Sequence, residues 1–341
     1  MKFEKIFRAD VNRCYSAGGT VVDGKLKFLL GTELQGAALC VDAQTLKTEE
    51  ACPGPGGTMS LIPIPGKNGD FLHIHSFFPV FQSAAAGILW TRKTADGWQT
   101  EKLVDLPYVH RFDLFEQEGR IWFIGATLGT TKMEKDDWSD PGKLWVGLLP
   151  EAPGEEMKLT PVLEGLVKNH GYCHVNWQGK DAALVTCESG VYVVYPPVAG
   201  SEEWTFEHII ERPISDVAIS DLDGDGEPEL LLLEDFHGDK ITINKKVDGE
   251  YKVVWEYPKT VQFVHVAWGG KLRGKPAFLC GTRRLDGGLF VITWDGEKYV
   301  TEDIEVGTLP ANAYVANGKD FDLILAANHG IDEGAIYKVT D

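Results

Sequence analysis

Short apolar runs recur along the whole chain, and turns rich in glycine and aspartate separate them. A run that is apolar at consecutive positions is typical of a strand buried on both faces, whereas alternation is typical of a strand with one face in solvent. No segment sustains the 3.6-residue period of an amphipathic helix, and 38 glycines and 17 prolines interrupt the chain. The pattern therefore predicts an all-β protein built from many short strands.

The apolar runs follow one order that repeats seven times. Each copy has an entry strand, a turn, an apolar second strand, a third strand and an amphipathic outer strand, with a period of roughly 44 to 60 residues that is typical of propeller blades. We therefore predict a single seven-bladed β-propeller over residues 1–341, with a two-domain β-sandwich protein as the alternative. The second strands are the clearest copies: LKFLLGT, DFLHIHS, RIWFIGA, DAALVTC, PELLLLE, PAFLCGT and FDLILAA.

The last copy, at about 310–341, lacks an outer strand because the chain ends after GAIYKVTD. The N-terminal segment KFEKIFRA has no strand nearby in the sequence with which to pair. We therefore predict that strand 2–9 completes the last blade. Such a closure would join the ends of the ring and remove an exposed sheet edge.

Composition narrows the classes of partner. The chain has 33 Lys and Arg against 51 Asp and Glu, a net charge of −18, which argues against nucleic acid or an anionic membrane surface. No apolar stretch approaches the roughly 20 residues of a membrane helix, and the N-terminus lacks the apolar core of a secretory signal. We expect a soluble cytoplasmic protein, monomeric or weakly homo-oligomeric. The six cysteines show no CxxC spacing, so neither a zinc cluster nor a disulfide framework is expected.

One turn, DLDGDGEPEL at 221–230, has the composition of a cation loop. The glycines permit a tight turn in which the carboxylates of Asp221, Asp223, Asp225 and Glu229 can converge, and hard oxygen ligands suit Ca²⁺. The sequence therefore predicts a structural calcium site. An Asp/Gly-rich turn without an ion is the alternative.

The same residues carry a family resemblance. The turn resembles the FG-GAP or VCBS propeller repeat, whose blades carry DxDGDGxxDL between the first and second strands. Glu229 stands where that motif has its last aspartate. The match covers one blade of seven, so the resemblance implies one ion and a role in the frame of the protein.

Seven of the nine histidines fall at one face of the predicted ring. The aspartate turn joins a first strand to a second strand and therefore lies on one face of the ring. The first strands begin, and the second strands end, on the opposite face, around the central channel. Histidines that converge there suit acid–base chemistry or a metal site, although any one of them could instead cap a strand or bond a loop carbonyl. The seven are His75, His110, His170, His174, His237, His265 and His329.

This combination of architecture and residue types resembles the seven-bladed propeller lyases and dehydratases of carbohydrate metabolism, among them oligogalacturonate, ulvan and rhamnosyl-glucuronate lyases and the propeller of aldos-2-ulose dehydratases. The resemblance implies β-elimination on a small uronate-containing oligosaccharide or a keto-sugar. Carried over by position, the resemblance implies that His110 or His174 is the base and that Tyr172 or Tyr15 is the acid. Arg111 and Arg284 would bind the carboxylate or enolate, and His75, His170 and Arg283 would make further substrate contacts. His237, His265 and His329 would be the ligands of a possible divalent transition metal.

A non-catalytic propeller that binds glycans or proteins is the competing class. A channel mouth filled with apolar side chains would favour it. The tryptophans that could form its aromatic rim are Trp90, Trp122, Trp138, Trp177, Trp204 and Trp268. The GxSxG, GxGxxG and Walker A motifs are absent, so the histidine cluster has no rival among the recognised catalytic motifs.

Overall fold

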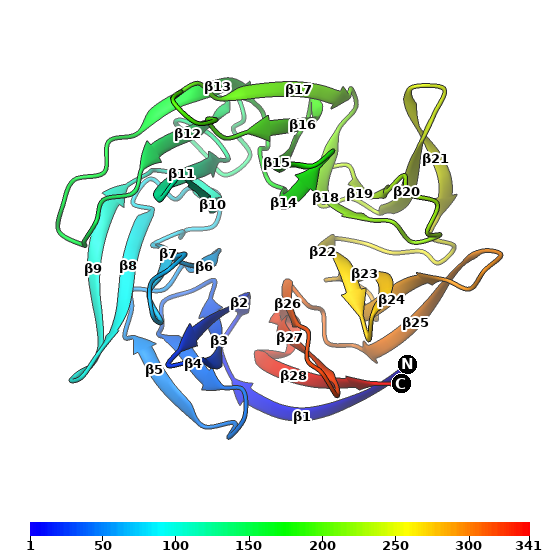
Figure 1. Ribbon diagram of the computed structural model, residues 1–341, viewed down its shortest axis with the longest axis horizontal. Coiled ribbons are helices and arrows are strands. Elements are labelled where there is room, and N and C mark those ends of the chain that lie inside the picture. The colour runs from blue at the N-terminus through cyan, green and yellow to red at the C-terminus, as the bar shows by residue number, and fades with distance from the viewer.

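The computed structural model describes all 341 residues and consists almost entirely of strands arranged as a ring (Figure 1). Its 28 strands form seven four-stranded antiparallel sheets around a common axis, as the repeat predicts. The single helical element is the 3-10 turn η1 (His329–Ile331). A membrane-spanning helix is absent from the structure.

Each sheet contributes one strand to the inside of the ring, around the central axis (Figure 1). The backbones at the beginnings of these strands therefore lie around a common centre, although they are far apart in the sequence. The innermost strands are β2 (Cys14–Val22), β6 (Leu61–Pro63), β10 (Val109–Gln117), β14 (Tyr172–Trp177), β18 (Ile214–Ser220), β22 (Val264–Leu272) and β26 (Asn312–Ala316).

The second strands are the continuous apolar runs, because neighbouring blades cover both of their faces. Leu232 and Phe278 are fully buried in this way, and each such side chain stabilises the fold by about 1.5–3 kcal/mol. The second strands are β3 (Lys25–Thr32), β7 (Phe71–His75), β11 (Arg120–Thr127), β15 (Lys180–Cys187), β19 (Glu229–Glu234), β23 (Lys275–Thr282) and β27 (Asp322–Asn328).

The third strands lie between the second strands and the edge of the ring. They are also largely buried and complete the packing between blades. They are β4 (Ala38–Asp42), β8 (Gly87–Thr94), β12 (Gly142–Leu148), β16 (Gly190–Tyr195), β20 (Lys240–Val247), β24 (Gly288–Trp294) and β28 (Glu333–Thr340).

The outer strands are mostly exposed or partly buried, and one of them closes the ring. β1 pairs antiparallel with β28, from Lys2 opposite Thr340 to Asp10 opposite Glu333, so the two termini lie side by side (Figure 1). The predicted closure is confirmed. The outer strands are β5 (Thr48–Cys52), β9 (Gly97–Asp105), β13 (Thr160–Leu166), β17 (Thr205–Ile210), β21 (Glu250–Glu256), β25 (Tyr299–Val306) and β1 (Lys2–Asp10).

Candidate active site at the centre of the ring

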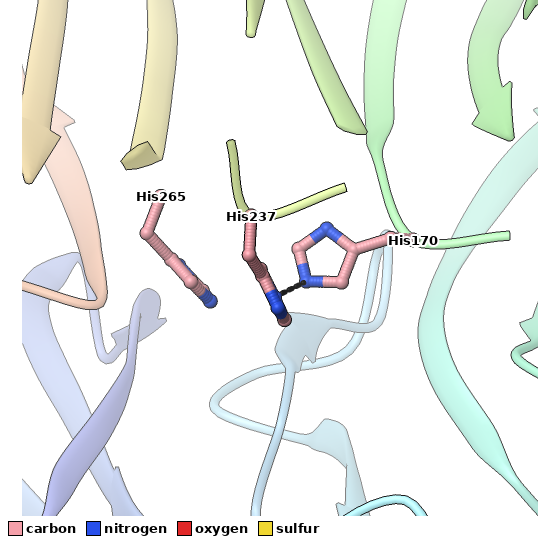
Figure 2. A group of neighbouring side chains, drawn as sticks. All are labelled: His170, His237 and His265. Carbon is pink, nitrogen blue, oxygen red and sulfur yellow. Dashed lines mark hydrogen bonds between the residues drawn. The ribbon is translucent and has the colours of Figure 1, made fainter. Parts of the chain in front are cut away.

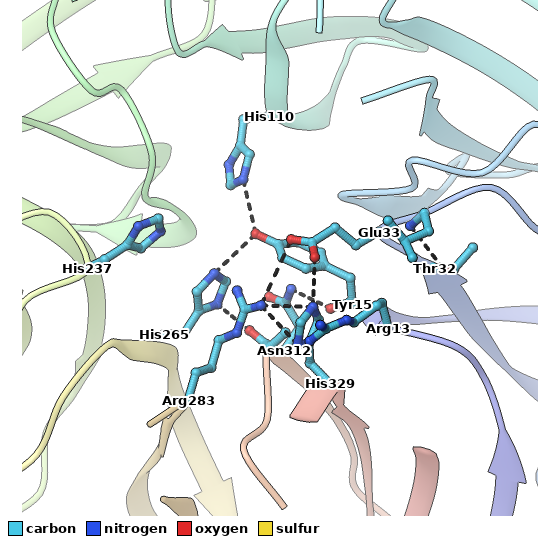
Figure 3. Close-up of polar contacts among 12 residues, drawn as sticks. Arg13, Tyr15, Thr32, Glu33, His110, His237, His265, Arg283, Asn312 and His329 are labelled. Atoms are coloured by element: carbon cyan, nitrogen blue, oxygen red, sulfur yellow. Dashed lines mark hydrogen bonds and ion pairs between the residues drawn. The ribbon is translucent and has the colours of Figure 1, made fainter. Parts of the chain in front are cut away.

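Four histidines and one tyrosine from five different blades meet at the centre of the ring (Figures 2 and 3). Tyr15, His110 and His265 lie at the beginnings of β2, β10 and β22, His170 lies just before β14, and His237 follows β19. Tyr15, His110, His170 and His265 are only 1–3% exposed, and His237 is partly buried. The predicted convergence of strand entries and exits therefore holds for these residues.

Hydrogen bonds to backbone carbonyls fix the tautomers of two of the imidazoles. Nδ1 of His265 donates to the carbonyl of Ala311 at 2.5 Å, and Nδ1 of His170 donates to the carbonyl of Ser215 at 3.3 Å. In the neutral rings each Nε2 therefore carries a lone pair. The two lone pairs point into the cluster.

Tyr15 lies between two imidazoles and links them. Its hydroxyl is 3.1 Å from Nε2 of His110 and 3.1 Å from Nε2 of His265 (Figure 3). Because His265 Nε2 is an acceptor, the hydroxyl donates to it and accepts the Nε2 proton of His110. His110 is then left with a lone pair on Nδ1, a buried atom without a hydrogen-bond partner. The three side chains thus form one directed hydrogen-bond chain.

Three of the imidazoles are close enough to share one ion. Ligand nitrogens of His170, His237 and His265 all lie within 4.8 Å of one another, and the Nε2 atoms of His170 and His237 are 3.2 Å apart (Figure 2). Metal–imidazole bonds of about 2.0–2.1 Å bring neighbouring ligand nitrogens to about 3 Å from each other. The predicted ligands His237 and His265 therefore meet, but His170 takes the place predicted for His329.

The imidazoles of the cluster are neutral at physiological pH. Burial lowers the pKa values of His110, His170 and His265 well below 6.5, and nearby positive charges and imidazoles add to the effect. Burial, with help from Arg283, lowers the pKa of His237 to about 3. Neutral imidazoles are the form that binds metals.

Arg111 brings a buried positive charge next to the cluster. Its guanidinium donates to the carbonyl of Met59 at 3.0 Å and to Oδ1 of Asn312 at 3.4 Å, and it makes no ion pair. The nearby carboxyl of Asp216 is 6% exposed, and burial raises its pKa to about 6 although Arg111 lowers it. A buried guanidinium without a carboxylate partner is costly, and an anionic ligand would relieve that cost.

A second polar group, Glu33 with His329 and Arg283, borders the cluster. His329 Nε2 is 2.7 Å from Glu33 Oε2, and Arg283 Nη2 lies 2.9 Å from His329 Nε2 and 3.9 Å from Glu33 Oε1 (Figure 3). The carboxylate therefore engages His329 and keeps it out of the group of three imidazoles. The sequence reasoning missed Glu33, whose one signal is its place directly after the second strand LKFLLGT.

His174 does not belong to this site, which corrects the prediction that it is a candidate base. Its Nδ1 is 2.7 Å from Asp113 Oδ2, and its Nε2 is 2.7 Å from Asp181 Oδ1. The two carboxylates raise its pKa to about 9 against the effect of burial, so at neutral pH it is an imidazolium without a free lone pair. Its role is to tie neighbouring blades together.

Three other predicted site residues also lie elsewhere. Tyr172 packs in the core between two blades, where burial raises its pKa well above 10. His75 bonds Ser76 through Nδ1, and its Nε2 lies beside Gly87, the first residue of β8, because alternation along β7 turns the ring toward the blade. Arg284 is exposed and lies over the ring of Phe263. The strand register alone could not show these directions.

An aromatic cap, defined as Phe81, Trp138 and Phe236, covers part of the cluster. The ring centroids of Phe81 and Trp138 lie 5.8 Å apart, and those of Trp138 and Phe236 lie 5.4 Å apart. Phe236 contacts His237 with ring centroids at 4.0 Å and His170 at 5.4 Å. Phe81 and Trp138 lie on the connections 76–86 and 128–141, which the repeat pattern did not place over the channel.

In the aspartate turn, a lysine ammonium contacts the predicted calcium ligands. Lys245 Nζ lies 2.5 Å from Asp223, 2.6 Å from Asp225 and 3.6 Å from the buried Glu229. The carboxylates of Asp221, Asp223 and Asp225 do converge within 4.8 Å. The predicted geometry is therefore present, while calcium binding itself stays a prediction.

The comparisons with known proteins establish the fold alone. No family model matches the chain, and no curated protein matches it in sequence. Among solved structures, the chain is similar to Sqt1 of Saccharomyces cerevisiae, with a TM-score of 0.59, 9% sequence identity and complete coverage of both chains. The protein is therefore a seven-bladed β-propeller, and the likeness at this low identity says nothing about its activity.

Proposed function

We propose that the protein is a carbon–oxygen lyase that carries out β-elimination on a small acidic sugar at the centre of the ring. The observation that carries the proposal is the meeting of a phenol, four neutral imidazoles and the unpaired guanidinium of Arg111. β-Elimination needs a base for the proton α to a carboxylate, an acid for the leaving oxygen, and positive charge beside the enolate. These groups supply all three.

The hydrogen-bond chain gives each group a role. Arg111 binds the substrate carboxylate, for which the planar guanidinium is well suited. His110 takes the α proton on Nδ1, the electrons form the new double bond, and the leaving oxygen takes the phenolic proton of Tyr15. The proton on Nε2 of His110 then returns to the Tyr15 oxygen, so the acid is restored. A bound carboxylate also offsets the Arg111 charge that lowers the pKa of His110, which makes the imidazole a stronger base.

His170, His237 and His265 would hold a divalent transition metal in this proposal. At His265 the ion would take the Nε2 lone pair, so the Tyr15 hydroxyl would give up its hydrogen bond to this imidazole and be free to face the substrate. The donor set fits, because imidazole nitrogens suit zinc, copper, iron and nickel ions and backbone carbonyls fix the tautomers of two of the three rings. When bound, such an ion acts as a Lewis acid that polarises a carboxylate or carbonyl oxygen.

Ultraviolet absorbance tests the proposal, because elimination creates a conjugated double bond and neither hydrolysis nor binding does. The purified protein is incubated with a panel of uronate-containing disaccharides and keto-sugars, with and without a chelator and added Zn²⁺ or Ni²⁺. We expect a rise with at least one substrate and its loss on chelation. His110→Gln should abolish the rise, whereas His208→Gln on the outer strand β17 serves as the matched control and should not.

A flat absorbance trace across the panel, in the presence of metal, would contradict the lyase proposal. The aromatic cap favours a second candidate function, a propeller that binds glycans without converting them, because such rings stack on sugars at binding surfaces. Quenching of Trp138 fluorescence by a sugar that gives no absorbance rise would support this second function.

A further inference from the structure

The connection 128–141 contains a loop that is hydrogen-bonded to itself and not to the rest of the ring. Its two ends, Gly129 and Pro141, pair as an isolated β-bridge. Within the loop, Asp137 accepts hydrogen bonds from two backbone amides, each at 3.0 Å. No hydrogen bond or ion pair joins residues 130–140, which we call the lid, to a residue outside the connection. The lid can therefore move as one unit about its two ends.

Aromatic and cation–π contacts hold the lid against the ring. Trp138 contacts Phe81 and Phe236, with ring centroids at 5.8 and 5.4 Å. Within the lid, Lys132 Nζ lies 3.3 Å from the centroid of Trp138, and outside it Lys168 Nζ lies 6.0 Å from the same centroid. Such contacts are individually weak, and their separation leaves no buried hydrogen-bonding group without a partner. These contacts can therefore open and close at low cost.

The rings that Trp138 contacts lie directly on the histidine cluster. Phe81 stacks on His237 with ring centroids 5.7 Å apart, and Phe236 contacts His237 at 4.0 Å and His170 at 5.4 Å. His170 is only 1% exposed. An imidazole that is covered to this extent offers no surface to a sugar, so a substrate can reach it only after the covering groups have moved.

We propose that the lid swings about Gly129 and Pro141, opening to admit a substrate to the histidine cluster and closing over it, with Trp138 as its main contact. The purpose of the movement rests on the lyase function proposed above, whereas the movement itself does not. Closure would exclude water, which strengthens electrostatic interactions in the site and protects an enolate from stray protonation. Opening would then be needed for substrate entry and for product release.

Carbethoxylation by diethyl pyrocarbonate tests this inference, because the reagent must reach a neutral imidazole nitrogen. The full-length protein is treated at pH 7, and peptide mass mapping compares His237 with the exposed His208. We expect His237 to react measurably but at least about tenfold more slowly, because only the open fraction reacts. Trp138→Ala should speed the reaction of His237 by about tenfold or more, since two ring contacts and a cation–π contact are lost. Trp98→Ala, which removes a ring beneath Lys93 on another blade, is the matched control and should change nothing.

A cross-link distinguishes a moving lid from a fixed cover. In the double variant Phe81→Cys/Trp138→Cys, a short bismaleimide joins the lid to the connection 76–86. The joined protein should label at His237 at least about tenfold more slowly than the same variant capped with N-ethylmaleimide, because the open fraction is removed. Wild-type protein given the same reagents controls for the six native cysteines.

Three results would overturn the inference. The first is a wild-type His237 that never reacts although it reacts in Trp138→Ala, which would show a fixed cover. The second is a wild-type His237 that reacts as fast as His208, and the third is equal labelling of the joined and the capped variant. Because labelling needs no turnover, a flat absorbance trace in the lyase assay leaves this result unaffected, and the two proposals can fail separately.

Discussion

Replacing Lys245 with glutamine tests whether the aspartate turn contains its own cation. The ammonium contacts Asp223 and Asp225 and lies 3.6 Å from Glu229, whose side chain is fully buried. Without the ammonium, three carboxylates remain within a short distance of one another and Glu229 loses its positive neighbour. The variant should therefore unfold at a lower temperature.

The expected magnitude follows from the exposure of the partners. Breaking a fully buried ion pair costs about 3–5 kcal/mol and losing an exposed one about 0–1 kcal/mol. The side chains of Lys245, Asp223 and Asp225 are 15%, 21% and 51% exposed, so we expect an intermediate loss of about 2 kcal/mol. With an unfolding entropy of about 2.1 cal/mol/K per residue, a chain of this length should lose about 3 °C in Tm.

Thermal unfolding in calcium and in chelator decides the outcome. The ammonium already neutralises these carboxylates, so against the calcium site predicted from the sequence we expect the wild-type Tm to be the same in both. The Lys245→Gln Tm should fall in chelator and recover in calcium, because hard oxygen ligands would then accept the ion. Lys246→Gln, an exposed neighbour without an ion pair, is the matched control. A wild-type Tm that rises by several degrees in calcium would refute this reasoning, since the ion would then displace the ammonium.

Three further predictions concern the two histidine environments. Tyr15→Phe should keep the fold and lower kcat by about 100-fold or more, as the loss of a general acid does, and a kcat unchanged by the variant would exclude that role. His174→Ala should leave turnover intact but lower the free energy of unfolding, measured in urea, by about 1–2 kcal/mol, a value that allows for the partial exposure of His174. Because the pKa of His174 is raised in the folded protein, its contribution to the free energy of unfolding is present below pH 6.5 and should disappear as the pH rises through about 9. The histidines of the central cluster have lowered pKa values, so their contribution to the free energy of unfolding should be lost as the pH falls from 6.5 toward about 3, the pKa of His237. A free energy of unfolding that stays constant over this range would contradict the burial of these residues as neutral imidazoles.

The sequence located the centre of the site but not its internal geometry. His110, His265 and Tyr15 share one position in the repeat, and identical positions in successive blades must approach the axis together. The same register placed His174 at the mouth, yet its ring lies between Asp113 and Asp181. Strand spacing gives the position of a backbone, whereas the direction of a side chain depends on which neighbours it can bond.

Long connections and ion pairs escaped prediction for a related reason. Trp138 and Lys132 lie on a connection that matches no other blade, so no repeat could place them over the channel. Lys245 lies 20 or more residues from two of the carboxylates that it contacts, and no pattern in the sequence pairs them.

The sequence by itself determined the number of blades, the order of strands and the closure of the ring, because hydrophobic periodicity and turn residues act locally and repeat. Only the tertiary structure decided which histidines form the group of three, which carboxylates hold Lys245, and which rings cover the centre. These choices depend on distances of a few ångströms between residues of different blades, where packing and desolvation select one arrangement of side chains from many that the same pattern allows.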